Sequence, residues 1–396
     1  MTHDPDQRGP AAASRGLTPF FLLTAVMSLG YGSVYTLLAQ IRDRFGFTDS
    51  QVGLIAFAGL GMGFVAQVFL ARYADRGHAG AMVRLGVVMA ALGMTWTVFA
   101  TELWQWVAAR LLLGLGSGTV GPAVRRVVIA RDPANVGSNL GRQASFDVAG
   151  FVLGPLLAAG LAEIFGLRAP FAVLAVTYVC VLGLVWRLDL HAGVEQRTPR
   201  VLRSLLAAPA MQAALCASIA FYATIGMFEA LWSLLLEDLG AETWLVGVTL
   251  SLFTVPMAVL APIGGRTAQR RGPMRVVTIS ILVATACTLS YGFLPLWVVI
   301  FISALHAVAD SFTMPGNQVA VAMSTPPEQL AAGQGLLGAV GLAVAGLMAL
   351  GGGQLYESAG RDVAFSATAG FMLVFLGLAR LRARSSANAA VAPAAA

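Results

Sequence analysis

Long apolar stretches recur along the whole of this 396-residue chain. A helix needs about 20 apolar residues to cross the hydrocarbon core of a bilayer. The stretches lack the period-two alternation of a transmembrane barrel strand, so helices are the spanning structures that they predict. Twelve stretches are found, at residues 18–40, 52–71, 82–100, 104–129, 139–163, 168–187, 209–236, 244–265, 274–294, 296–322, 329–356 and 362–381. The predicted fold is an all-α membrane protein with twelve transmembrane helices.

Charged residues are scarce and occupy particular places. They make up 11% of the chain, against about 25% in soluble domains, which is too little to cover soluble domains with polar surface. All 25 basic residues are arginines and lie mostly between apolar stretches, so we expect no nucleic-acid partner. The chain has no lysine for a phosphate-binding Gly-Lys loop, so we expect no ATP. Its three cysteines and four histidines are scattered, which argues against a metal site, a cofactor or an enzyme.

The arginines also predict the orientation in the membrane. An even number of spans places both termini on one side. That side holds 20 arginines, and the other holds Arg42, Arg44, Arg168 and Arg361. Positive residues are enriched in cytoplasmic loops, so we expect a multi-pass protein of the inner or plasma membrane with both termini in the cytoplasm.

The two halves of the sequence repeat each other at an offset of 194 residues. Gly46 matches Gly240, Gly141 matches Gly335, and Arg266 matches Arg72. Such parallel repeats predict two pseudo-symmetric six-helix bundles that rock against each other around a site at mid-membrane. The expected organisation is a cytoplasmic tail (1–16), an N-terminal bundle (17–187), a cytoplasmic central loop (188–208), a C-terminal bundle (209–383) and a disordered tail (384–396).

Three local motifs resemble those of the major facilitator superfamily of transporters. Residues 71–78, Ala-Arg-Tyr-Ala-Asp-Arg-Gly-His, resemble the loop motif Gly-x-Leu-Ala-Asp-Arg-x-Gly-Arg, although three family positions differ. Residues 110–114 are similar to the family's Arg-x-x-x-Gly motif. Residues 150–155, Gly-Phe-Val-Leu-Gly-Pro, resemble the motif typical of the drug/proton antiporter branch. The resemblance covers residues 17–383 and implies alternating access between the two bundles.

This resemblance implies a set of gating residues. The loop motif would lock the cytoplasmic side in one conformation, and its repeat copy at residues 265–272 has glutamine in place of the acid. Small residues allow close helix contact and proline bends a helix, so the fifth span is expected to take part in the conformational change. The expected gating residues are Asp75, Arg76, Asp147, Gly150, Gly154, Pro155, Arg266 and Arg270.

Ionisable residues inside the spans are candidates for function because a charge at bilayer depth is costly. Ser303, His306, Asp310, Thr313 and Asn317 follow a 3-4-3-4 spacing, which draws one polar stripe along the tenth span. We expect Glu229 in the seventh span, together with His306 and Asp310, to carry the coupling proton. The alternative is a static polar network. Many drug/proton antiporters have an acid in the first span, and this chain has none there.

In the superfamily the first, fourth, seventh and tenth spans line the central cavity. The resemblance therefore implies a substrate cavity lined by Arg110, Tyr31, Tyr35, Tyr222, Trp232, Ser303, Thr313 and Asn317. An apolar pocket with one or two acids suits amphipathic or cationic organic compounds.

The leading hypothesis is a secondary transporter of small organic molecules, most simply a proton-coupled exporter that works as a monomer. Two alternatives stay open. One is an importer of the same fold that takes up a metabolite or sugar with protons, and the other is a membrane receptor or assembly factor that does not transport.

Overall fold

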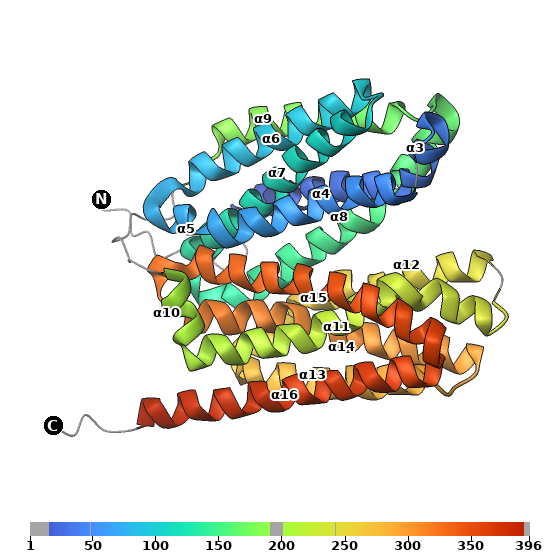
Figure 1. The fold of residues 1–396 in the computed structure, drawn as a ribbon. Helices are drawn as coiled ribbons and strands as arrows, with labels where there is room; N and C mark the ends of the chain where they lie inside the picture. The colour runs from blue at the N-terminus through green and yellow to red at the C-terminus, as the bar shows by residue number, and fades with distance from the viewer. Residues whose placement is uncertain (1–15, 48, 191–200, 242, 392–396) are drawn as a thin grey trace, which may run out of the picture.

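The computed structural model describes residues 16–47, 49–190, 201–241 and 243–391, and the regular elements in these ranges are helical. Figure 1 shows two stacked groups of helices, one from each half of the chain. The first group contains α2 (Thr18–Thr36), α4 (Asp49–Phe69), α6 (Ala79–Phe99), α7 (Leu103–Arg131), α8 (Val136–Phe165) and α9 (Ala169–Arg187). The second contains α11 (Pro209–Asp238), α12 (Thr243–Arg271), α13 (Pro273–Tyr291), α14 (Leu296–Ser324), α15 (Leu330–Ala359) and α16 (Arg361–Val391).

Short helical elements link these long helices. α3 (Leu38–Phe45) follows α2, and α10 (Val201–Ala207) precedes α11. α5 (Ala71–Tyr73) and the π-helical turn η2 (Ala74–His78) join α4 to α6, and the 3₁₀ turns η3 (Pro133–Asn135) and η4 (Pro327–Gln329) precede α8 and α15.

The helices have the length and surface of membrane spans. Within the described residues, nine helical segments are long and apolar enough to cross a membrane, and one of them, Leu54–Phe99, runs from within α4 to the end of α6. Large apolar side chains are also exposed on the outside of the bundle, including Phe99 at 70% and Phe301 at 75%. Such a surface fits lipid and not water. The predicted all-α, multi-pass membrane fold is therefore confirmed.

The internal duplication is visible in the backbone. Gly46 and Gly240 have φ of 70° and 82°, and Gly166 and Gly360 both have φ of 87°. Only glycine adopts these angles at little cost, and each of the four follows a helix end. The turns η3 and η4 also occupy matching positions, 194 residues apart. These shared features confirm two pseudo-symmetric bundles.

The two halves are joined along a contact that we call the seam, formed by α8 against α12 and by α4 against α15. Gly137 and Gly141 of α8 lie directly against the carbonyl groups of Gly265 and Ala261 in α12. In the symmetric position, a Cβ atom on Gly335 of α15 would lie 2.5 Å from the Gln67 carbonyl oxygen of α4. Glycine is therefore required for these backbones to approach so closely.

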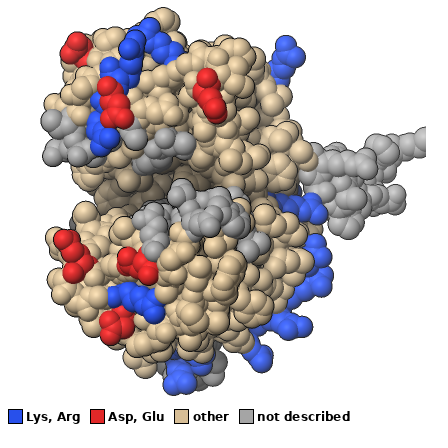
Figure 2. Space-filling model, turned by 90° about the vertical axis from the view of Figure 1, so that its right-hand side faces the viewer, with Lys and Arg blue, Asp and Glu red and all other residues tan. Residues whose placement is uncertain are grey.

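The seam lies at one end of the molecule, and the other end is open. Figure 1 places α5, α10 and the end of α16 at the same end, where the seam forms. Figure 2 views the opposite end and shows a hollow between the two halves. The described residues thus form a seam at one end of the bundle pair and leave a hollow at the other.

Replacing Gly141 by leucine should open the seam, because the new side chain would collide with Ala261 and Pro262 of α12. Gly160→Leu on the same helix is the matched control, since nothing lies within 4 Å of a Cβ atom there. We expect Gly141→Leu to shift the population toward the conformation in which the seam is open by at least about tenfold, the order of an overpacking penalty. Distances between spin labels at positions 187 and 271 measure this shift, and an unchanged distance distribution would contradict it.

The C-terminal tail differs from its expected disorder. Helix α16 continues to Val391, so residues 384–391 are helical. Alanine is the residue most compatible with a helix, and the segment is rich in it. Residues 1–15, 191–200 and 392–396 of the predicted tails and central loop lie outside the described residues.

Candidate functional site

Asp75 connects the two halves at one side of the seam. Gly77, with φ of 81°, turns the chain between α4 and α6, and the loop directs Asp75 toward the start of α15. The Asp75 carboxylate accepts hydrogen bonds from the backbone N–H groups of Ala331 at 2.8 Å and Ala332 at 2.9 Å. Arg126 of α7 lies 3.2 Å from the same carboxylate, and both side chains are 3% exposed. A helix N-terminus favours an anion, so this arrangement, the Asp75 lock, holds the two halves together.

Asp75 lies in the loop between two spans, and its ionisation is linked to sealing. Burial raises the pKa of this carboxyl to about 6, against the opposing effects of the Ala331 and Ala332 amides and of Arg126. An exposed aspartate has a pKa of about 3.9. Proton binding stabilises the conformation in which the titrating group has the higher pKa. Protonation therefore stabilises the sealed form fully below the exposed pKa, and this contribution is lost as the pH rises through about 6.

The repeat copy of the motif forms a second, neutral connection. Gln269 of α12 accepts a hydrogen bond from the Gly137 N–H at 2.6 Å and donates one to the Ala134 carbonyl at 2.8 Å. Arg266 reaches the Ser138 hydroxyl at 3.4 Å. Gln269 and Gly137 are each 194 residues from Asp75 and Ala331. This Gln269 lock is the pseudo-symmetric partner of the Asp75 lock, without a titratable group.

The other expected loop residues lie at the surface. The Arg76 guanidinium stacks on the Tyr73 ring, with 5.1 Å between the charge and the ring centroid. Arg270 is exposed. The acid and the amide of the two motif copies, Asp75 and Gln269, therefore make the main polar contacts between the halves, and Arg266 adds one to Ser138.

The fifth-span motif packs within the N-terminal half. Gly150 and Gly154 of α8 lie against the backbone carbonyls of Ala25 and Leu29 in α2, and Pro155 lies beside Gly32. Asp147 accepts a hydrogen bond from the Ser28 hydroxyl of α2. An acid is therefore present beside the first span, although it is supplied by the fifth.

His306 and Asp310 are enclosed in the C-terminal half. Both are fully buried, with 3.7 Å between His306 Nε2 and Asp310 Oδ2. The Tyr291 hydroxyl of α13 lies 3.0 Å from His306 Nδ1, and the rings of Phe228 and Phe253 pack around the imidazole. Sequence reasoning did not identify Tyr291, because only the packing of α13 against α14 brings it to this position.

The polar stripe of α14 does not face the cavity along its whole length. The Thr313 hydroxyl donates to Ser280 of α13 at 2.7 Å, and Ser303 bonds its own helix. Trp232 is also inside the C-terminal bundle, where its indole N–H donates to Thr249 at 3.0 Å. These three residues were expected to line the cavity. The sequence spacing defines the stripe, but the rotation of α14 against α13 turns Ser303 and Thr313 away from the cavity.

Arg110 is buried among N-terminal helices. Its guanidinium lies 4.8 Å from the Tyr31 ring centroid and packs against Gly59 of α4. A cation over an aromatic face is favourable, more so when desolvated. The side chains of Glu229 and Tyr35 lie outside the described part of the structure.

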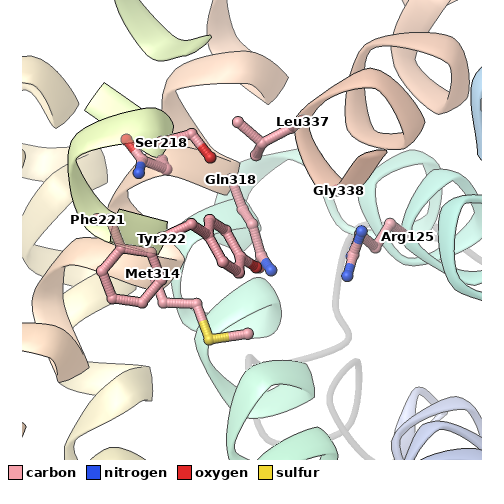
Figure 3. Close-up of a pocket in the computed structure, with 9 residues that line it drawn as sticks. Arg125, Ser218, Phe221, Tyr222, Met314, Gln318, Leu337 and Gly338 are labelled. Carbon is pink, nitrogen blue, oxygen red and sulfur yellow. The ribbon is translucent and has the colours of Figure 1, made fainter. Parts of the chain in front are cut away.

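A small pocket lies between the two halves, about 9 Å from the sealed end by the helical rise from Arg125 to Arg131. Its volume is about 20 Å³, room for roughly one water molecule. Figure 3 shows Arg125 entering from one side and Tyr222 and Gln318 from the other. The lining residues are Arg125, Ser218, Phe221, Tyr222, Met314, Asn317, Gln318, Leu337 and Gly338. Tyr222 and Asn317 were expected at the cavity, whereas Arg125, Ser218 and Gln318 were not.

The sequence matches the Major Facilitator Superfamily over residues 20–231 and 213–396. The chain belongs to the major facilitator superfamily. It is a multi-pass membrane protein and a secondary transporter, not an enzyme. It lies in a lipid bilayer and binds a small-molecule substrate. The two matched ranges overlap at residues 213–231 and together cover both bundles.

This superfamily member is similar to three proteins, one in sequence and two in fold. It is 24% identical over 331 residues to the multidrug resistance protein MdtG of Salmonella dublin, which covers 78% of this chain and 80% of that protein. Its fold is similar to that of the human organic anion transporter MFSD10, with a TM-score of 0.74 and 18% identity over 94% of this chain and all of that one. It is also similar to FucP of E. coli in the outward conformation, with a TM-score of 0.75 and 17% identity over 92% and 98% of the two chains.

Proposed function

We propose that this superfamily member exports small organic molecules across the plasma membrane in exchange for protons. The observation that carries the proposal is the seam. The two halves are joined at one end only, by close glycine contacts and by two hydrogen-bonded locks, and Figure 2 shows a hollow at the other end. Breaking the seam while closing the hollow would expose a central site to each side in turn. The relationship to MdtG supports export of drug-like compounds.

The arginine distribution supports placing the sealed end, and both chain termini, in the cytoplasm. The structure would then correspond to an outward-facing form. The moving bodies would be residues 17–187 and 209–383. Because one chain supplies both sides of the seam and of the central pocket, we propose that a monomer is sufficient for transport.

Protons would be carried by Asp310, with His306 and Glu229. Neither Asp310 oxygen has a hydrogen-bond partner among the described residues, and both it and His306 are fully buried. Charging a carboxyl group in such surroundings is costly. Proton release at this position would therefore require a conformational change that admits water or a donor, which is the linkage that a proton-coupled transporter needs.

Everted membrane vesicles test the direction and the driving force. An exporter accumulates a fluorescent organic dye inside everted vesicles whose lumen is acidic, and a protonophore abolishes that accumulation. The control is a vesicle preparation from cells without the protein. Uptake into right-side-out vesicles, driven by an inward proton gradient, would instead identify an importer and contradict the proposal.

A further inference from the structure

The pocket between the halves contains one positive charge and no acid among its described lining residues. Arg125 of α7 is half-buried and supplies the guanidinium from the N-terminal half. The opposite wall comes from α11 and α14 of the C-terminal half, through Ser218, Tyr222, Asn317 and Gln318. A planar guanidinium is the side chain best suited to bind a carboxylate, because its N–H groups match the two oxygens.

Among the described residues, two polar side chains of this wall are buried without a hydrogen-bond partner. Asn317 is 2% exposed, and neither its amide nitrogen nor its amide oxygen is bonded. The Ser218 hydroxyl is fully buried and unbonded. Buried polar groups normally make hydrogen bonds, and a buried group without a hydrogen-bond partner costs free energy. These two groups therefore point to a partner that is bound in another state of the protein.

The pocket is too small for a substrate in the sealed form. Its volume of about 20 Å³ holds roughly one water, and its walls belong to different halves. Parting the seam would widen the space between Arg125 and the wall that contains Ser218 and Asn317, and would open it toward the sealed end. Such a site has a high affinity in one conformation and a low affinity in the other. A ligand must have this difference in affinity if it is to shift the conformational equilibrium.

Asp147 provides a competing negative charge. It lies on α8 within electrostatic range of Arg125, and it is held by the Ser28 hydroxyl. In the sealed form it partly compensates the guanidinium. An anionic ligand would take over that compensation, so Asp147 opposes binding and favours release.

We infer that Arg125, with Asn317 and Ser218, binds the carboxylate group of an amphiphilic organic anion when the seam is parted. The aromatic rings of Phe221 and Tyr222, which also line the pocket, would contact its apolar body. The inference rests on the proposed transport function and revises the substrate class expected from the sequence, which was amphipathic or cationic. Export of an anion in exchange for a proton moves two positive charge equivalents inward, which a negative interior potential favours.

Binding to the purified protein in nanodiscs tests the inference. The probes are phenylbutyrate, phenylbutylamine and phenylbutyramide, which share one carbon skeleton, and binding is measured by calorimetry. We expect the carboxylate to bind at least tenfold more tightly than the amine or the amide. Arg125→Gln should weaken carboxylate binding at least tenfold, and Arg125→Lys should weaken it less. Arg187→Gln, which removes an exposed arginine from the same half, should bind like the wild type.

Two further variants keep the test informative if Arg125→Gln does not fold. Asn317→Asp has nearly the same shape and places an anion in the pocket, so it should weaken carboxylate binding. Asp147→Asn removes the competing charge and should strengthen it severalfold. Equal binding of carboxylate by Arg125→Gln and the wild type, preferential binding of the amine, or no carboxylate binding at all would overturn the inference.

This measurement is independent of direction and of proton coupling. If the vesicle experiment shows no proton-driven export but the three variants change binding as described, the proposed function fails and the anion site stands. If export is observed and Arg125 does not affect carboxylate binding, the inference alone fails.

Discussion

Replacing Asp75 by alanine should shift the protein strongly out of its sealed form. The change removes the acceptor of the Ala331 and Ala332 N–H groups and leaves Arg126, which is 3% exposed, without its carboxylate. Removing one partner of a buried ion pair costs about 3 kcal/mol or more, which is a change of about two orders of magnitude in the equilibrium. Spin labels at positions 187 and 271, in a variant lacking Cys180, Cys216 and Cys287, would report this as a longer distance.

Two controls separate the lock from general effects of charge. Asp189→Ala removes a carboxylate that is 68% exposed and paired with Arg131, and exposed pairs contribute little. Gln269→Ala removes the neutral lock and should have a smaller effect than Asp75→Ala, because no buried charge is left behind. Distances in Asp75→Ala that match those of Asp189→Ala would show that the Asp75 lock does not hold the seam.

The same variant should lose a dependence on pH. In the wild type, lowering the pH from 7 to 5 should favour the sealed form, because Asp75 has a pKa of about 6 when it is buried in the lock and a lower one when exposed. In Asp75→Ala this carboxyl group is absent, so its contribution to the pH dependence of the distance distribution should be lost.

Neutralising Asp310 should abolish proton-linked transport. Asp310→Asn keeps the shape of the side chain but cannot carry a proton between conformations, so we expect substrate-driven proton flux to fall at least about tenfold, the order of the loss expected for a positioned proton-transfer group. A pH-sensitive dye inside proteoliposomes measures the flux. Glu229→Gln and His306→Gln test the other two proposed residues in the same assay.

The matched control is Thr288→Val on α13. This threonine is buried and, among the described residues, donates its hydroxyl to the Ala284 carbonyl of its own helix, so its loss should leave the flux close to the wild-type value. If proton flux survives in both Asp310→Asn and Glu229→Gln, coupling does not depend on these acids. Asp147 beside the first span would then be the next residue to test, because it is bonded to Ser28.

The locks show how the sequence and the structure contribute different information. The motif at residues 71–78 and its copy 194 residues later are visible in the sequence, as is the substitution of acid by amide at Gln269. What each side chain binds is not visible, because Asp75 and Ala331 are 256 residues apart. The glycines of the seam could likewise be read only as small residues until α8 and α12 were seen to pack together.

The sequence by itself determined that the chain consists of membrane-spanning helices and that its two halves are duplicated. This is possible because lipid requires every backbone polar group to be satisfied within a helix of limited length, so long apolar stretches indicate where the spans lie. Only the tertiary structure decided which way each helix is turned. The stripe on α14 is divided between α13, which receives Thr313, and the pocket between the halves, which receives Asn317. Helix rotation depends on side-chain packing between segments distant in sequence, and that packing also places Arg125 opposite Asn317.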